Sequence, residues 1–298
     1  DGGQASLTAC DITINSSNLY SDTTAVFVLN GDADLQLSGT SIVCAETSQV
    51  TVARAIWTQD TASLTIDAHA SIRSEIIGFT EAIHCASTTA AQLAGTDFAD
   101  GKYGVYLDNA IVDLTVNDCS FFNYERALQV PAGKKFTFSN ISIDQDQPVS
   151  NQVGVYASTY SSMTISGTIS NQNIAVHVSG DHTGQDISQV TFNNCNWELL
   201  AEQDISWPGN KITTEVTLPV GHYHIENPVT IEEGGKLILL PGTIIDAQHK
   251  GYNVFNVKGS LDAEGVLFED FPTGTDTYFI NLSASGSAKV SDCQFIIA

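Results

Sequence analysis

Residues 25–42 read AVFVLNGDADLQLSGTSI, and the same pattern returns at 103–121 as YGVYLDNAIVDLTVNDCSF and at 252–268 as YNVFNVKGSLDAEGVLF. In each stretch a short aliphatic strand and a turn lead into a second short strand. A single turn residue then leads into a third strand. The pattern recurs about nine times with a period of about 26 residues, which is typical of stacked repeats rather than of a globular core.

One column of the repeat holds the single turn residue between the second and third strands. Glycine, asparagine and aspartate dominate this column, and these residues adopt a left-handed backbone at little cost. We therefore expect a tight left-handed turn at each position, followed by a small or apolar residue that points inward. The predicted turn residues are Ala9, Gly39, His69, Gly95, Asp118, Asn140, Gly167, Asn194, Gly242, Gly265 and Asp292.

A second column lies in the first strand of each repeat and is apolar throughout. By strand alternation it faces a core, and the residue after it points outward. We find no helical i, i+3, i+4 pattern of useful length. The sequence predicts an all-β parallel β-solenoid of about eleven coils with three short strands per coil. The inward residues are Val26, Ile56, Ile83, Val105, Leu128, Val155, Val176, Val254 and Phe279.

The chain resembles the right-handed parallel β-helix superfamily, the pectin-lyase-like fold, over nearly its whole length. The resemblance rests on the aliphatic first strand and on the turn sequences SGTSI, NDCSF and PGTII at 38–42, 117–121 and 241–245. It is closest in character to the β-helical repeat regions of bacterial surface proteins and adhesins. The resemblance implies a right-handed coil, but the superfamily includes lyases, hydrolases, adhesins and phage spikes, so the fold does not fix the function.

The sequence repeat is interrupted once, at WPGN of residues 207–210. The segment that follows contains LPVGHYHI at 218–225 and resembles the first coils of many secreted β-helices. We predict two β-helical segments, 1–206 and 207–298, that are continuous or coaxial. Bare solenoid ends expose strand edges, so we expect either a piece of a longer surface protein or ends that meet other subunits head to tail.

Composition limits the partners of this chain. Its 298 residues carry 11 basic and 34 acidic side chains, a net charge of −23. This charge argues against binding to nucleic acid or to anionic membrane surfaces. No apolar stretch is long enough to span a membrane. We expect an extracellular or cell-surface protein.

The six cysteines have two interpretations. Six cysteines in a secreted protein suggest three disulfides. However, Cys10, Cys119, Cys195 and Cys293 follow the turn residue several coils apart, well beyond the roughly 6 Å between Cα atoms that a disulfide allows. We expect buried free thiols that pack as small apolar side chains.

The outward residues of the first strand form the best candidate binding surface. Rings recur in this column and would lie about 5 Å apart on one face. They can stack on sugar rings or contact a surface protein; the alternative is that they stack on one another for stability alone. The candidate binding residues are Phe27, Trp57, His84, Tyr106, Tyr156 and His177, and Phe255 continues the column.

Two motifs contain residue types that bind metal ions. His222, His224 and Glu226 share one strand face by alternation, with Tyr223 turned inward, and two histidines with a carboxylate can hold zinc. No third histidine is near in sequence, so we expect solvated side chains there and no metal site. The acidic loops at 144–146 and 269–270 lack the spacing of a dedicated calcium loop. We expect no cofactor, with calcium as the open alternative.

The sequence gives little evidence for a catalytic function. Arg54 and Arg126 occupy matching positions, three residues before Trp57 and Gln129, but an ion pair between Arg54 and Glu81 of the next coil explains Arg54 more simply. The hydrolase motifs of the superfamily (NTD, DD, GHG and RIK) are absent. We predict a non-catalytic adhesin or stalk module with no assigned catalytic residue. The alternatives are a polysaccharide lyase or hydrolase and a self-assembling fibre or spike subunit.

Overall fold

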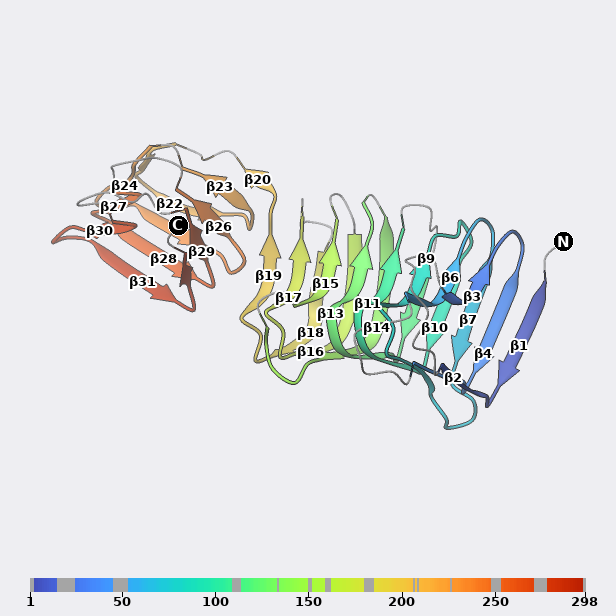
Figure 1. The fold of residues 1–298 in the computed structure, drawn as a ribbon. Coiled ribbons are helices and arrows are strands. Elements are labelled where there is room, and N and C mark those ends of the chain that lie inside the picture. The colour runs from blue at the N-terminus through green and yellow to red at the C-terminus, as the bar shows by residue number, and fades with distance from the viewer. Residues whose placement is uncertain are drawn as a thin grey trace. The chain divides into compact units, whose positions relative to one another are not determined.

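The computed structural model describes residues 3–14, 25–44, 53–108, 114–132, 134–149, 152–158, 162–179, 185–205, 207, 209–225, 227–247, 253–270 and 278–296. Every regular element within these residues is a β-strand, and the strands form a parallel β-solenoid of about nine turns (Figure 1). The predicted fold class is confirmed. The expected count of eleven coils is too high. We counted one coil for each turn residue, but a turn residue can belong to an incomplete coil: around Ala9 the described residues provide only two of the three strands.

The chain divides into two compact units, which we call unit 1 and unit 2. Unit 1 comprises Asp1–His177 and Thr183–Asn196, and unit 2 comprises Val178–His182 and Trp197–Ala298. The sequence-based segments 1–206 and 207–298 stay a prediction.

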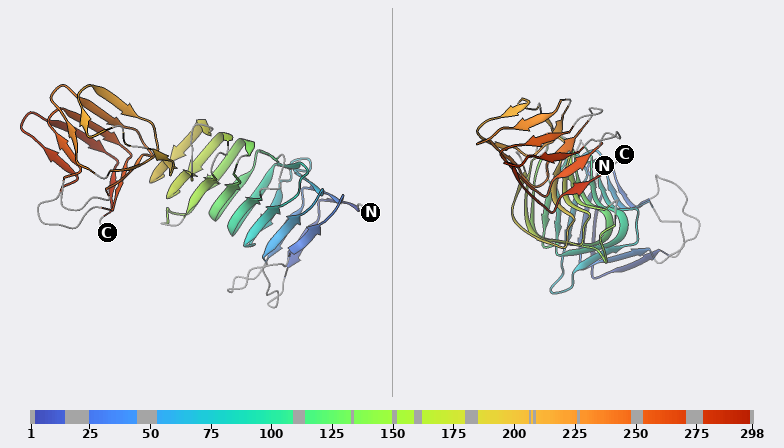
Figure 2. Two further views of the ribbon diagram at one scale, coloured as in Figure 1. Left: turned by 90° about the horizontal axis from the view of Figure 1, so that it is seen from above. Right: turned by 90° about the vertical axis from the view of Figure 1, so that its left-hand side faces the viewer.

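Each turn of unit 1 contributes strands to three rows, and the strands of a row pair in parallel from one turn to the next (Figure 2). The first row, which carries the candidate binding surface, contains β3 (Ala25–Leu29), β6 (Arg54–Thr58), β9 (Glu81–Cys85), β11 (Thr96–Leu107), β13 (Ser120–Val130), β15 (Val153–Ala157) and β17 (Ile174–Val178).

The other two rows complete each turn. The second contains β1 (Gln4–Thr8), β4 (Asp34–Ser38), β7 (Ser63–Asp67), β10 (Ala91–Ala94), β12 (Leu114–Asn117), β14 (Lys135–Asp144), β16 (Ser162–Ser170) and β18 (Gln185–Asn193). The third contains β2 (Asp11–Ile14), β5 (Ser41–Cys44) and β8 (Ser74–Ile77), followed by the first residues of β11 and β13 and the last residues of β14, β16 and β18.

The core of unit 1 is a set of stacked apolar columns. Side chains alternate between the two faces of a strand, so in-register parallel pairing places equivalent inward residues directly above one another. Burial of these columns removes apolar surface from water, the main source of stability in such a fold. In the second row, one column is at most 2% exposed and consists of Leu37, Ile66, Leu93, Val116, Phe138 and Ile165.

The predicted turn column is confirmed at ten of its eleven positions, where the backbone is left-handed. His69 is the exception. There, residues 68–73 form a longer excursion between β7 and β8, with an antiparallel bridge between His69 and Ile72. The buried position beside Thr40 is occupied by Ser74, whose hydroxyl accepts a hydrogen bond of 3.1 Å from the Thr40 amide. The prediction failed because the extra residues shift the alignment past the turn.

All six cysteines are free thiols, as expected. Cys44, Cys85 and Cys119 are buried and the other three are half-buried. Cysteine and threonine play the same part after the turn residue: the Cys119 thiol donates to the Asn117 carbonyl at 3.5 Å, and the Thr96 hydroxyl donates to the Ala94 carbonyl at 3.0 Å. Burial raises the pKa of Cys119 to about 11, so the thiol stays protonated and packs as a small side chain.

In unit 2, β19 (Trp197–Ala201) precedes three parallel sheets. One contains β20 (Asp204–Ile205), β23 (His222–His224), β26 (Ile244–Asp246), β29 (Leu267–Glu269) and β32 (Gln294–Phe295). The second contains β21 (Lys211–Ile212), β24 (Val229–Ile231), β27 (Phe255–Val257) and β30 (Ile280–Leu282). The third contains β22 (Glu215–Leu218), β25 (Lys236–Leu239), β28 (Ser260–Glu264) and β31 (Ser287–Ser291).

Phe255 belongs to the core of unit 2, not to an outward face. It pairs with Val229 on the neighbouring strand, is fully buried, and packs among the rings of Trp207 and Phe268. The predicted outward position was wrong because β27 begins at Phe255, and Val254 before it is also buried.

Candidate functional site

The outward residues of the first row of unit 1 align in register from turn to turn. Trp57 pairs with His84, and His84 pairs with Tyr106. Tyr106 pairs with Gln129, and Gln129 pairs with Tyr156. We call this half-buried column the ring ladder; its members are Trp57, His84, Tyr106, Gln129, Tyr156 and His177.

Phe27, which we expected on this face, does not belong to the ring ladder. Phe27 pairs with Ile56 and Val28 pairs with Trp57, so β3 is shifted by one residue from the predicted alignment. Val28 is the outward residue and is 47% exposed. The shift was not visible in the sequence because all five residues of β3, AVFVL, are apolar, and alternation then leaves the facing undefined.

A second outward column lies beside the ring ladder, three residues earlier in each strand. In β6, Ala55 and Ile56 are both fully buried, so Arg54 and Trp57 both face outward although a regular strand would place them on opposite faces. In register, this second column consists of Arg54, Glu81, Tyr103 and Arg126.

The first of the two inward residues is small because the backbone of the next turn lies against it. A Cβ atom on Gly104 would lie 2.5 Å from the carbonyl oxygen of Ala127. The sequence contains a pattern typical of this geometry, which our prediction did not use: a small residue precedes an aliphatic one in each strand. These pairs are AI, AI, GV, AL, GV and AV at 55–56, 82–83, 104–105, 127–128, 154–155 and 175–176. Recognition of that pattern would have placed Tyr103 beside the ladder.

The rings of the ladder contact one another. The centroid of Trp57 lies 5.9 Å from that of His84, and the centroid of His84 lies 4.8 Å from that of Tyr106. Tyr156 meets His177 edge to face at 5.2 Å. These separations follow the strand spacing of about 4.8 Å. The rings thus contact one another in tilted or edge-to-face arrangements rather than in parallel stacks, and ligand binding stays a prediction.

At the Arg54 end of the ladder, the charges are paired. The predicted ion pair is confirmed: Arg54 Nε lies 2.6 Å from Glu81 Oε2, and both side chains are about 15% exposed. His84 Nδ1 lies 2.8 Å from the same oxygen, and the guanidinium lies 4.7 Å from the Trp57 ring centre. Burial by itself raises the pKa of Glu81, but the hydrogen bond and charge of His84, with the charge of Arg54, outweigh it and hold that pKa below 4.5.

At Arg126, the described residues provide no carboxylate that pairs with the cation. Its guanidinium lies 4.4 Å from the ring centre of Tyr156 and 6.0 Å from that of Tyr103, and it donates to Gln129 Oε1 at 2.9 Å. Within the described part of the chain, Arg126 makes no ion pair. Burial, followed by the charge of Asp108, raises the pKa of the adjacent Tyr106 above 10.0, so its phenol keeps a proton to donate. Arg126 therefore presents a half-buried cation between two aromatic faces.

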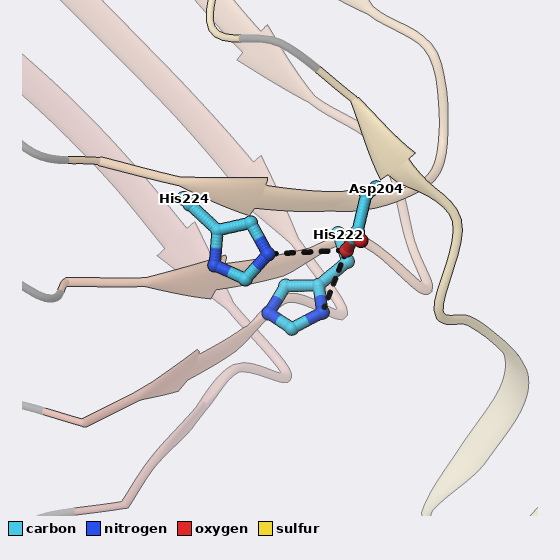
Figure 3. Close-up of side chains that lie close together, drawn as sticks. All are labelled: Asp204, His222 and His224. Carbon is cyan, nitrogen blue, oxygen red and sulfur yellow. Dashed lines mark hydrogen bonds and ion pairs between the residues drawn. The ribbon is translucent and has the colours of Figure 1, made fainter.

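A second cluster, in unit 2, joins Asp204 to His222 and His224 (Figure 3). His222 and His224 point outward from β23 because Tyr223 and Ile225 alternate with them and are buried, as predicted. Asp204, on β20, pairs with His222. Its Oδ1 atom lies 3.0 Å from His224 Nε2 and 3.7 Å from His222 Nδ1. We call these three residues the histidine cluster.

The expectation of solvated histidines is wrong for His222, whose side chain is only 18% exposed. Two further carboxylates explain the enclosure. Asp246 Oδ2 lies 2.8 Å from His224 Nδ1, and Glu269 Oε1 lies 3.5 Å from His222 Nε2. Glu226, which we had grouped with the histidines, lies outside the described residues.

The two histidines differ in electrostatics. Burial, and then the neighbouring His224, lower the pKa of His222 below 6.5. Burial also opposes charge on His224, but hydrogen bonds to Asp204 and Asp246 outweigh it and raise the pKa of His224. Burial and the charge of Asp246 raise the pKa of Glu269. The pKa shifts thus favour the neutral ring of His222 and the protonated ring of His224, which lies between two carboxylates.

Comparison of the chain with protein-family models, with curated proteins and with solved structures found no match. Function therefore has to be argued from the two sites themselves. Within the described residues, no helix has the length and apolar character needed to cross a membrane.

The histidine cluster borders a pocket of about 370 Å³ in unit 2. Asp204 and His224 line it together with Trp207, Asn210 and Asn227. Within the described chain, the histidine cluster is the only group of three or more histidine, cysteine and acidic residues whose ligand atoms lie within 4.8 Å of one another. The acidic loops at 144–146 and 269–270, the candidates for calcium, do not form such a group.

Proposed function

We propose that unit 1 is a non-catalytic carbohydrate-binding module of a secreted or cell-surface protein, of the adhesin or stalk type. The ring ladder is its contact face. The observation that carries the proposal is the arrangement around Arg126, whose cation makes no ion pair within the described residues and lies between the rings of Tyr156 and Tyr103.

The ladder offers both kinds of contact that a sugar needs. Half-buried rings present apolar faces with a polar tip, a combination that favours interfaces with ligands that are apolar on one side and wet on the other. The guanidinium of Arg126 has donors in a fixed fork that fits a pair of neighbouring oxygens. Tyr106 adds a phenolic donor one turn away. Sugar rings combine apolar C–H faces with hydroxyl pairs, so they fit this arrangement.

The net charge of the chain favours neutral glycans over anionic ones. The chain carries a net charge of −23, which repels a polyanionic chain at long range. A single arginine can bind a hydroxyl pair without any anionic partner. We therefore propose neutral oligosaccharides as the ligand class, bound along the ladder over several turns.

A glycan array of neutral and uronic-acid oligosaccharides tests the proposal. We expect the full chain to bind neutral glycans, and the triple variant Trp57→Ala, Tyr106→Ala, Tyr156→Ala to lose detectable binding. Loss of one ring contact, in Tyr156→Ala, is expected to weaken binding roughly tenfold, since aromatic contacts contribute about 0.5–1.5 kcal/mol beyond burial.

Phe122→Ala provides the matched control, because Phe122 is an exposed ring of β13 that lies outside the ring ladder. It should bind as the unchanged protein does. Absence of binding to every glycan, or equal loss in Phe122→Ala and Tyr156→Ala, would contradict the proposal. Binding only to uronic acids would overturn the assignment to neutral glycans.

A further inference from the structure

The histidine cluster of unit 2 has the composition and spacing of a metal site. Zinc is held by imidazole nitrogen and carboxylate oxygen at about 2.0–2.2 Å, so two ligand atoms of a tetrahedral site lie about 3.3 Å apart. The Asp204 carboxylate lies 3.0 Å from His224 Nε2 and 3.7 Å from His222 Nδ1. These separations bracket the tetrahedral value, and the three ligand atoms all lie within 4.8 Å of one another.

The residues behind the histidines strengthen the case. A metal-binding histidine typically donates its other ring N–H to a carboxylate, which fixes the tautomer and the ring orientation. His224 Nδ1 makes such a hydrogen bond to Asp246 at 2.8 Å, whereas His222 Nε2 lies 3.5 Å from Glu269 Oε1 and makes no hydrogen bond within the described residues. The nitrogens left over, His224 Nε2 and His222 Nδ1, are the two that face Asp204 (Figure 3).

The backbone holds this arrangement in place. Asp204 and His222 are direct partners on β20 and β23, and His224 and Asp246 are direct partners on β23 and β26. Asp246 is only 4% exposed, and a buried carboxylate is stable only where positive charge or hydrogen bonds compensate it. A divalent cation beside the two histidines supplies such charge.

We propose that unit 2 binds a divalent transition-metal ion, zinc by preference, through the Asp204 carboxylate, His222 Nδ1 and His224 Nε2. Calcium and magnesium prefer sites built from oxygen, so the two imidazoles select against them. Three protein ligands leave one tetrahedral position, and Asp204 and His224 also line the neighbouring pocket. That position is open to water or to an oxygen or nitrogen donor of a ligand in the pocket, as in zinc sites that exchange ligands rather than in closed structural sites.

Zinc titration of the chelator-treated full chain against a competing fluorescent indicator tests the site. We expect roughly one zinc ion per chain at micromolar free zinc. Cobalt in its place should give the visible absorption bands of a tetrahedral ion with mixed nitrogen and oxygen ligands. Calcium at the same concentration should not compete.

Three substitutions distinguish the loss of a metal ligand from the loss of the fold. Asp204→Asn changes a side chain that is 77% exposed, so the fold should persist. Asp204→Asn and His224→Gln should each weaken zinc binding by roughly 100-fold or more, whereas Asp246→Asn should weaken it about 10–100-fold, the range typical for residues behind a metal ligand. Glu264→Gln and His69→Gln, at exposed positions outside the cluster, are the controls and should bind zinc unchanged.

Two results would overturn the inference: no zinc retained at micromolar free zinc, or unchanged zinc affinity in both Asp204→Asn and His224→Gln. Thermal unfolding of each variant without zinc checks that unit 2 is still folded. The glycan array reports on unit 1 and the titration on unit 2, so one proposal can fail without the other.

Discussion

The ring ladder and the histidine cluster are built on the same scaffold in opposite ways. The ladder places one position of the repeat above itself over successive turns, so similar side chains recur at the strand spacing and their contacts extend along a face. The cluster occurs once: Asp204 on one strand meets His222 and His224 on the next, and the strand after that provides Asp246 behind His224. Residues that recur at one position of the repeat therefore form an extended surface, whereas residues that occur only once form a compact site.

The difference extends to charge. In the column beside the ladder, Arg54 pairs with Glu81, and Arg126 contacts two aromatic rings and the side-chain amide of Gln129. Around the cluster, the three carboxylates of Asp204, Asp246 and Glu269 outnumber the positive charges that two histidines can supply. We therefore propose a neutral ligand with many weak contacts for the ladder and a small cation with few strong contacts for the cluster.

The largest effect that we predict separates the two sites by chelation. Zinc at about 100 times its Kd should stabilise unit 2 by about 2.7 kcal/mol, because it binds the folded state only. Chelation should remove that stabilisation and leave glycan binding by unit 1 unchanged. Thermal unfolding and the glycan array, each with and without chelator, measure the two quantities. If chelation abolishes glycan binding, the two sites are not independent.

An intermediate effect is predicted for Gly104→Ala in unit 1. The added Cβ would lie 2.5 Å from a backbone oxygen, so the strand must shift, and overpacking of this kind costs roughly 1–3 kcal/mol. Denaturant unfolding measures the loss, and glycan binding should weaken because Tyr106 follows two residues later. Gly3→Ala, where a Cβ meets nothing within 4 Å, is the control and should be neutral. Zinc affinity should not change in either variant.

The smallest effect concerns Glu81 and acid. The folded-state pKa of Glu81 is held below 4.5, so its ionised form contributes stability that is present above that value and is lost as the pH falls through the folded-state pKa. Glu81→Gln should cost about 1 kcal/mol at pH 7, the net scale of a hydrogen bond. It should also flatten the decline in stability below pH 4.5 relative to the unchanged protein. Urea unfolding from neutral to acidic pH measures both; an equally steep acid decline in the variant would contradict the assignment.

Much of unit 1 could be predicted from the sequence because its pattern is local and repeated. The left-handed turn residues, the free cysteines beside them, the Arg54–Glu81 pair and the ladder from Trp57 to His177 all follow from alignment of one turn with the next. The failures lie where the pattern is degenerate or interrupted. Phe27 is in an all-apolar strand, and His69 lies in an excursion that no neighbouring turn shares.

The sequence by itself determined a parallel solenoid, its inward columns and the outward column of rings, because strand alternation and a repeated turn act over a few residues. Only the tertiary structure decided the register of each strand and the side chains that meet across strands. His222 and His224 are visible as a pair in sequence, but Asp204 and Asp246 join them through parallel pairing with strands about 20 residues away. The spacing of adjacent coils, rather than any local motif, creates the histidine cluster.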